Sequence, residues 1–279
     1  GKIEYFNPTG SVKDRSAFAM IEALDAEGRI SDATEIVEAS SGNNGVACAW
    51  AGMLRNIPVT IVMPEHMSIE RRKLMKHFGA EVVLTPKEQG TKGAIDEAER
   101  LLSERPNAIM LGQFSNPANV DIHAETTAEE IWRDTGGRID AVVAGIGTGG
   151  TFTGIAERLK SYNPYLHMIA VEPASCPVLS EGRSGVHNIQ GLSSGHVPDI
   201  LGTNYIDEII TVSDQDAVHY ARLAARIEGL PVGISSGAAL KALHDVASQP
   251  DMKGKRIVAI LADGACRYFS TDLFLDSED

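Results

Sequence analysis

Apolar runs rich in Val, Ile and Leu alternate with helical patterns along almost the whole chain. A strand that is buried on both faces reads as a continuous apolar run, and parallel strands need a crossover connection, usually a helix, between them. We therefore predict an α/β protein with mostly parallel sheets covered by helices. The predicted strands are residues 3–6, 34–39, 58–63, 81–84, 108–111, 140–144, 168–172, 208–212 and 256–261. The predicted helices are residues 13–28, 44–56, 68–78, 91–105, 122–134, 154–162, 215–228 and 238–246, with a strand-like turn at 232–235.

The chain of 279 residues is long enough to form two lobes of ordinary domain size. We place the boundary between two strand–helix series, which gives a smaller lobe at residues 1–117 and a larger lobe at 118–279. The alternation is interrupted at residues 173–204, a stretch rich in Gly, Ser and Pro. Irregular segments this long are usually functional, so we expect this one to border the site.

Charge and cysteine content exclude several classes of protein. A net charge of −13 argues against nucleic acid or an anionic membrane as the main partner. No apolar run approaches the roughly 20 residues of a membrane span, and no signal segment is visible, so we expect a cytoplasmic protein. Cys48, Cys176 and Cys266 are widely spaced and lack metal-ligand spacing. They predict free thiols and no metal site.

Lys13 is the first candidate for chemistry. It follows the turn residues 7–11 (Asn-Pro-Thr-Gly-Ser) and lies in the first turn of a predicted helix. The positive end of a helix disfavours another positive charge, which lowers the pKa of a lysine and frees its amine to attack a carbonyl. Lys13 is therefore a candidate Schiff-base lysine. Taken alone, a surface lysine beside Asp14 and Arg15 is the commoner case.

Three loops lead from a predicted strand into a predicted helix, where parallel sheets bind ligands. Residues 40–45 (Ser-Ser-Gly-Asn-Asn-Gly) suit a small carboxylate, or form a turn with a helix cap. Residues 145–154 combine glycines with three threonines, which favours a phosphate site. In residues 233–239, Ser235 is either a hydrogen-bond partner for a ring nitrogen or an N-cap.

The second loop also satisfies a dinucleotide pattern. Gly145, Gly147 and Gly150 fit G-x-G-x-x-G, and Glu172 ends the next strand where a ribose-binding acid would lie. An NAD-dependent dehydrogenase is therefore an alternative. Against it, this unit follows several strand–helix pairs rather than opening its domain, and Lys13 is left unexplained.

Five motifs together carry a resemblance that spans essentially the whole chain. They are residues 7–15 (NPTGSVKDR), 40–45 (SSGNNG), 113–119 (QFSNPAN), 147–154 (GTGGTFTG) and 233–239 (GISSGAA). In order and spacing they resemble the cysteine synthase (O-acetylserine sulfhydrylase) and cystathionine β-synthase family. The resemblance implies pyridoxal 5'-phosphate as cofactor, a two-lobed tryptophan-synthase-β-like architecture (fold type II), and a homodimer.

The resemblance also implies a role for each motif. Lys13 would hold the cofactor as a Schiff base and then abstract the α-proton of the substrate. Asn43 would contact the phenolic oxygen of the cofactor ring, and Ser235 would face the ring nitrogen. The cofactor phosphate would be held by Gly147, Thr148, Gly149, Gly150 and Thr151. The substrate would be bound by Ser40, Ser41, Gly42, Asn44 and Gln113, with Gly191 on its border.

The implied reaction is β-replacement, in which O-acetyl-L-serine and sulfide give L-cysteine through an aminoacrylate intermediate. Alternatives within this chemistry are cystathionine synthesis, cysteine desulfhydration and use of O-phosphoserine. An alternative outside it is a catalytically silent regulatory relative that binds partners. Serine acetyltransferase is a possible partner. Departures from the family pattern are Asn44, Asp263 and residues 193–196 (Ser-Ser-Gly-His), and the N-terminal segment of the family is expected to be absent.

Overall fold

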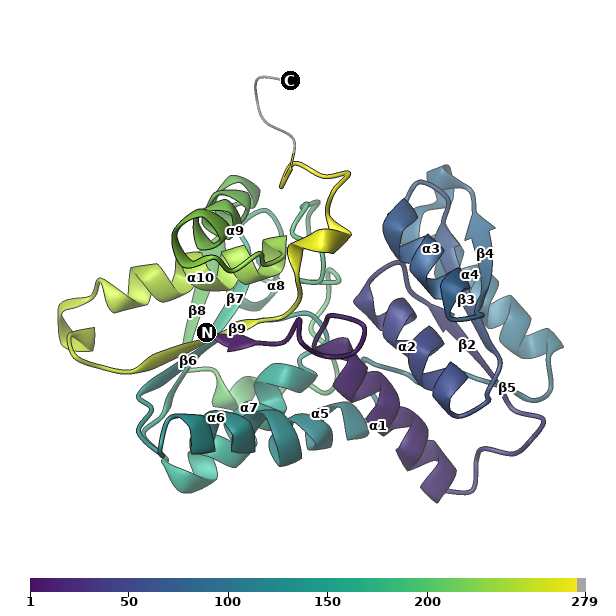
Figure 1. Ribbon diagram of the computed structural model, residues 1–279, viewed down its shortest axis with the longest axis horizontal. Helices are drawn as coiled ribbons and strands as arrows, with labels where there is room; N and C mark the ends of the chain where they lie inside the picture. The colour runs from purple at the N-terminus through teal and green to yellow at the C-terminus, as the bar shows by residue number, and fades with distance from the viewer. Residues whose placement is uncertain (275–279) are drawn as a thin grey trace.

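The computed structural model describes residues 1–274 and contains two parallel sheets flanked by helices (Figure 1). The larger sheet has the order β1-β9-β6-β7-β8, and the smaller has the order β4-β3-β2-β5. Their bounds are β1 Lys2–Ile3, β2 Glu35–Ala39, β3 Val59–Pro64, β4 Glu81–Thr85, β5 Ala108–Ile109, β6 Ala141–Gly145, β7 His167–Pro173, β8 Glu208–Val212 and β9 Ile257–Leu261. Every pairing between these strands is parallel, which confirms the predicted α/β class.

The helices cover both faces of each sheet. Their bounds are α1 Lys13–Ala26, α2 Asn43–Leu54, α3 Ile69–His77, α4 Gly90–Glu104, α5 Ala118–Ile122, α6 Ala128–Asp134, α7 Gly150–Tyr162, α8 Val178–Glu181, α9 Asp214–Glu228 and α10 Ile234–Ala247. A π-helical segment, His123–Thr127, joins α5 to α6. Among residues 1–274, no helix has the length and apolar character needed to cross a membrane.

Successive residues of a central strand enter different cores. In β6, Ala141 and Val143 pack with the helices α9 and α10. Val142 and Ala144 point the other way and pack with α6 and α7. All four side chains are buried. This burial on both faces is the physical reason for the continuous apolar runs in the sequence.

The chain begins in the larger sheet. β1 pairs with β9 in the register Lys2 to Ile260 and Ile3 to Leu261, so the first strand lies outside the smaller lobe to which residues 1–117 were assigned. The rest of the division at residues 117 and 118 stays a prediction. Helix α1 lies between the two sheets and packs against α2 on one side and α5 on the other (Figure 1).

Three helices begin about four residues earlier than predicted. They start at Ala118, Gly150 and Ile234. In the predicted strand-like turn at 232–235, Val232 forms an antiparallel β-bridge with Gly264, but residues 234 and 235 are helical. Gly, Ser and Asn have low helix propensity, but their small side chains are buried at these starts, and packing overrides propensity. As a result the loops before α7 and α10 are shorter, and Thr151 and Ser235 lie in first helical turns.

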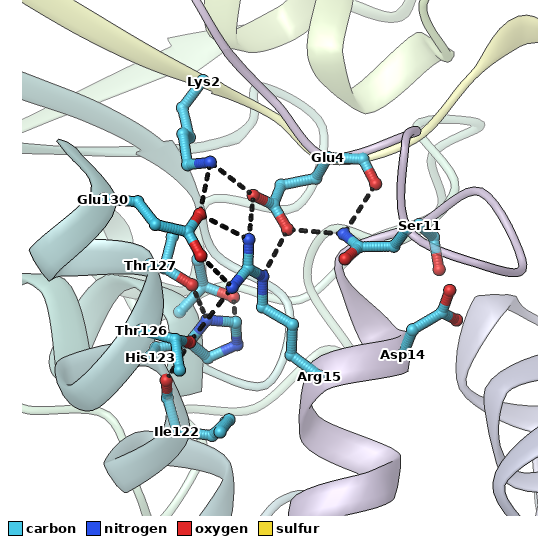
Figure 2. Close-up of polar contacts among 12 residues, drawn as sticks. Lys2, Glu4, Ser11, Asp14, Arg15, Ile122, His123, Thr126, Thr127 and Glu130 are labelled. Atoms are coloured by element: carbon cyan, nitrogen blue, oxygen red, sulfur yellow. Dashed lines mark hydrogen bonds and ion pairs between the residues drawn. The ribbon is translucent and has the colours of Figure 1, made fainter. Parts of the chain in front are cut away.

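A partly buried ion-pair network anchors the start of α1 to the larger lobe (Figure 2). Arg15 Nε lies 2.8 Å from Glu4 Oε2, and Arg15 Nη2 lies 2.7 Å from Glu130 Oε2. Lys2 adds a contact of 2.6 Å to Glu130, whose pKa is lowered to about 2, chiefly by hydrogen bonds from Arg15. Glu4 is completely buried. Lys13, two residues before Arg15, therefore enters the interior on a fixed helix.

Candidate active site

The Lys13 amine faces the glycine-rich loop. Lys13 is the first residue of α1, and its Nζ donates to Thr148 Oγ1 over 3.3 Å, across 135 residues of sequence. Burial lowers the pKa of Lys13 to about 8, so a useful fraction of the amine is neutral near physiological pH. The pKa of Lys13 is lowered as expected, but burial, rather than the positive end of the helix, is the main cause. The alternative interpretation, a surface lysine beside Asp14 and Arg15, is wrong for this structure.

The loop from β6 to α7 is shaped for an anion. Gly149 has a φ of 88° and is the N-cap of α7, whose first turn leaves N–H groups free for a ligand. A Cβ atom on Gly150 would lie 2.4 Å from Asn119 Oδ1, and one on Gly147 would lie 2.3 Å from the carbonyl oxygen of Gly191. Neighbouring protein atoms thus leave no room for a side chain at either position, so the loop can turn tightly only with glycine there. A tight glycine turn that leads into a helix N-terminus fits a phosphate group.

Asn119 is a site residue whose role the sequence did not reveal. It is completely buried, and its Nδ2 donates to Thr148 Oγ1 over 3.1 Å and to the carbonyl of Gln113 over 2.8 Å. Asn119 therefore ties the glycine loop to the segment that carries Gln113. In the sequence, Asn119 was indicated only by its place in the motif at residues 113–119, and it lay outside the helix predicted to begin at residue 122.

His123 is a second residue that sequence reasoning missed. Its Nε2 lies 3.2 Å from Thr151 Oγ1, and its Nδ1 lies 2.8 Å from Thr127 Oγ1. Burial, assisted by the charge of Lys13, lowers the pKa of His123 to about 3. The imidazole is therefore neutral and orients the Thr151 hydroxyl without adding charge.

We expect the His123→Gln variant to lose stability less steeply in acid than the unchanged protein. The unfolded chain binds a proton at His123 below about pH 6.5, whereas the folded protein resists it down to about pH 3. Folding therefore weakens as pH falls through this window, by up to about 1.4 kcal/mol per pH unit from this group. Urea unfolding of both proteins at several pH values measures the difference. If the free energies of unfolding of the two proteins fall with pH in parallel, the lowered pKa assigned to His123 is contradicted.

Asn43 and Ser235 lie at the starts of two different helices. Asn43 opens α2; its Nδ2 donates to Asp263 Oδ2 over 2.6 Å, and its Oδ1 accepts from Arg267 over 2.7 Å. Ser235 lies in the first turn of α10 and is 7% exposed. The N-cap of α10 is Gly233, so the alternative that Ser235 caps the helix is wrong. Ser235 Oγ would lie 3.9 Å from a Cβ atom on Gly191.

The predicted carboxylate loop is joined to Gln113 through a buried acid. Asn44 Nδ2 donates to Glu38 Oε1 over 3.2 Å, and the other oxygen of Glu38 accepts the N–H of Leu111 over 3.3 Å. Burial raises the pKa of Glu38 to about 7. Ser40 Oγ accepts the N–H of Gly45 over 3.0 Å, so Ser40 also stabilises the turn. Ser41 and Gly42 complete this turn before Asn43.

Glu172 is not available for a ribose. It is buried, and its two carboxylate oxygens accept the N–H groups of Leu179 and Ser180, over 2.7 and 3.0 Å. The Ser180 hydroxyl adds a third hydrogen bond of 2.6 Å. The carboxylate thus holds α8 in place. This geometry removes the residue on which the dinucleotide alternative depended.

Comparison with known proteins identifies the class. Residues 1–263 match the family model described as pyridoxal-phosphate dependent enzyme. The chain therefore belongs to the pyridoxal-phosphate-dependent enzymes, and the cofactor predicted from the sequence is confirmed.

Individual relatives show which family within this class the chain resembles. The chain is 47% identical over 275 residues to cysteine synthase B of Campylobacter jejuni, covering 98% of this chain and 90% of the relative. It superposes on cysteine synthase of Entamoeba histolytica with a TM-score of 0.96 and 43% identity, over 99% of this chain and 82% of that one. A hydrogen sulfide-producing enzyme of Fusobacterium nucleatum gives a TM-score of 0.91 and 40% identity, over 95% and 90%. Within its class, the chain is a member of the cysteine synthase family.

Proposed function

We propose that this protein forms L-cysteine from O-acetyl-L-serine and sulfide by pyridoxal-phosphate-dependent β-replacement. The observation that carries the proposal is the Lys13 amine, 3.3 Å from Thr148 in the anion-binding loop, in a chain of the cysteine synthase family. When bound, the cofactor supplies an electron sink for the negative charge that develops at the substrate Cα. The protein supplies position, proton transfer and exclusion of water.

In this proposal, the residues that meet at the loop hold the cofactor. Lys13 would hold it through the neutral amine, and the same amine would move the proton at the substrate Cα. The N–H groups and hydroxyls of residues 147–151 bind the phosphate, and Asn119 and His123 hold Thr148 and Thr151 in orientation. Asn43 would donate to the phenolic oxygen, and Ser235 would face the ring nitrogen.

The substrate carboxylate is assigned to the turn at residues 40–44 and to Gln113. The link from Asn44 through Glu38 to Leu111 supports this assignment, because it connects both segments within the smaller lobe. Gly191 borders the substrate at the start of the Ser193–His196 run. There Ser194 Oγ lies 3.3 Å from His196 Nδ1, and the His196 ring packs against Phe114 at 5.5 Å between centroids.

A turnover assay tests the proposal. Purified protein reconstituted with pyridoxal phosphate should produce cysteine from O-acetyl-L-serine and sulfide. Parallel reactions with homocysteine, with cysteine alone and with O-phosphoserine test the alternatives. The polar Ser193–His196 run is the observation that favours another nucleophile or donor. Turnover in one of the parallel reactions, without turnover of O-acetyl-L-serine and sulfide, would change the assigned substrates. No turnover in any of the reactions would overturn the proposal.

We also propose that the enzyme works as a cytoplasmic homodimer, with serine acetyltransferase as a partner. The family resemblance supports this setting. Light scattering of the purified protein tests the dimer, and titration with serine acetyltransferase tests the partner. A monomer at micromolar concentration would contradict the first part.

A further inference from the structure

Asp263 joins the backbone segments that carry three proposed cofactor contacts. It follows β9 and forms an antiparallel bridge with Ser11, two residues before Lys13. Beside it, the N–H of Val12 donates to the carbonyl of Ala262 over 2.8 Å. The carbonyl of Asp263 accepts the N–H of Gly233 over 3.0 Å, two residues before Ser235. The backbone at Asp263 thus fixes the entries to α1 and α10 relative to each other.

The Asp263 side chain connects this junction to the third contact, Asn43. The carboxylate is completely buried, and its Oδ2 accepts Asn43 Nδ2 over 2.6 Å and the Tyr268 hydroxyl over 2.7 Å. Arg267 donates to the other end of the same amide, Asn43 Oδ1, over 2.7 Å. Turning the amide over would set its oxygen against a carboxylate and its NH₂ against a guanidinium. The amide is therefore held in one orientation, with one N–H bound to Asp263 and the second without an acceptor among residues 1–274.

The remaining oxygen of Asp263 lies at the start of α10. Oδ1 is buried and has no hydrogen-bond partner within residues 1–274. It lies so close to Gly233 that a Cβ atom there would approach it to 2.0 Å. The partial positive charge of the helix N-terminus offsets part of the cost of this buried charge.

We propose that Asp263 is a positioning residue for the cofactor: it fixes the Asn43 amide so that an N–H, and not the carbonyl, is presented to the phenolic oxygen. Its backbone keeps this amide in register with Lys13 and Ser235. The inference rests on the proposed function, in which Asn43 contacts that oxygen. A residue at 263 that cannot accept from Asn43 would leave the amide held at its oxygen end by Arg267 and no longer held at its nitrogen end.

Cofactor binding to two variants tests the proposal. The dissociation constant of pyridoxal phosphate is measured by absorbance titration of the apo-protein. We expect Asp263→Ala to weaken binding about tenfold or more, because Asn43 loses its acceptor. Asp263→Asn should stay within about threefold, since a carbonyl oxygen can still accept from Asn43 and Tyr268. The alanine variant should also shift the bound cofactor from its long-wavelength band, which needs an ionised phenolic oxygen, to a shorter-wavelength band.

A double-mutant cycle separates positioning from folding. In an Asn43→Ala background, Asp263→Ala should cause little further loss of cofactor affinity, because Asp263 acts through Asn43. Tyr268→Phe is the matched control: it removes the other donor to Oδ2 and should leave the affinity within about threefold. Equal losses in both backgrounds, or an unchanged affinity and spectrum in Asp263→Ala, would overturn the inference. Failure of the unchanged protein to bind the cofactor would instead overturn the proposed function.

Discussion

Replacing Lys13 with methionine is expected to lower the rate of cysteine formation by at least about 10³-fold, because the nucleophile and the proton-transfer group are lost together. Methionine keeps most of the side-chain volume, so the environment of Thr148 should remain packed. The buried amine with a pKa of about 8 is replaced by a group that neither attacks a carbonyl nor carries a proton. The variant should also lose the visible absorption band of covalently held cofactor.

The matched control is Lys92→Met. The Lys92 side chain is 82% exposed and pairs with Asp96 on the surface of α4, so its removal should leave the rate unchanged. Stopped assays of cysteine formation and absorbance spectra of both variants measure the effect. A Lys13→Met protein that retains the band and more than about a tenth of the rate would contradict the assignment of Lys13.

Replacing Arg15 with methionine is expected to lower the free energy of unfolding by about 3 kcal/mol or more. Glu4 is fully buried and accepts from Arg15. The substitution therefore leaves its carboxylate with Lys2 as the one remaining cationic partner within residues 1–274 (Figure 2). Glu130 loses the hydrogen bonds from Arg15, which are the largest cause of its lowered pKa, and keeps the contact with Lys2. Because the network anchors α1, the variant should also hold the cofactor less tightly through a displaced Lys13.

Urea unfolding measures the stability effect, with Arg100→Met as the control. Arg100 pairs with Glu97 and Glu104 on the exposed face of α4, where its side chain is 49% exposed. Exposed pairs contribute little, so this variant should lose less than about 1 kcal/mol. Similar losses of unfolding free energy in Arg15→Met and Arg100→Met would contradict the prediction that the burial of Glu4 makes the Arg15 contacts more stabilising than an exposed ion pair.

Local patterns in the sequence predicted the architecture because they record how the backbone is buried. The alternation in β6, where Val142 and Val143 enter different cores, appears in the sequence as one apolar run. The glycine loop and Lys13 were found for a related reason: each lies where a predicted strand or turn leads into a helix. Helix starts were misplaced where buried small residues such as Gly150 and Ser235 belong to the first turn.

The sequence by itself determined the α/β class, the cofactor through its motifs, and the residues from which a site could be built. Only the tertiary structure decided which of them meet, as Lys13 meets Thr148 and Asn43 meets Asp263 across more than 100 residues. It also revealed Glu38, Asn119 and His123 as buried partners. The physical reason is that periodicity is a local property, whereas desolvation and contact depend on how distant segments are ordered in the sheets.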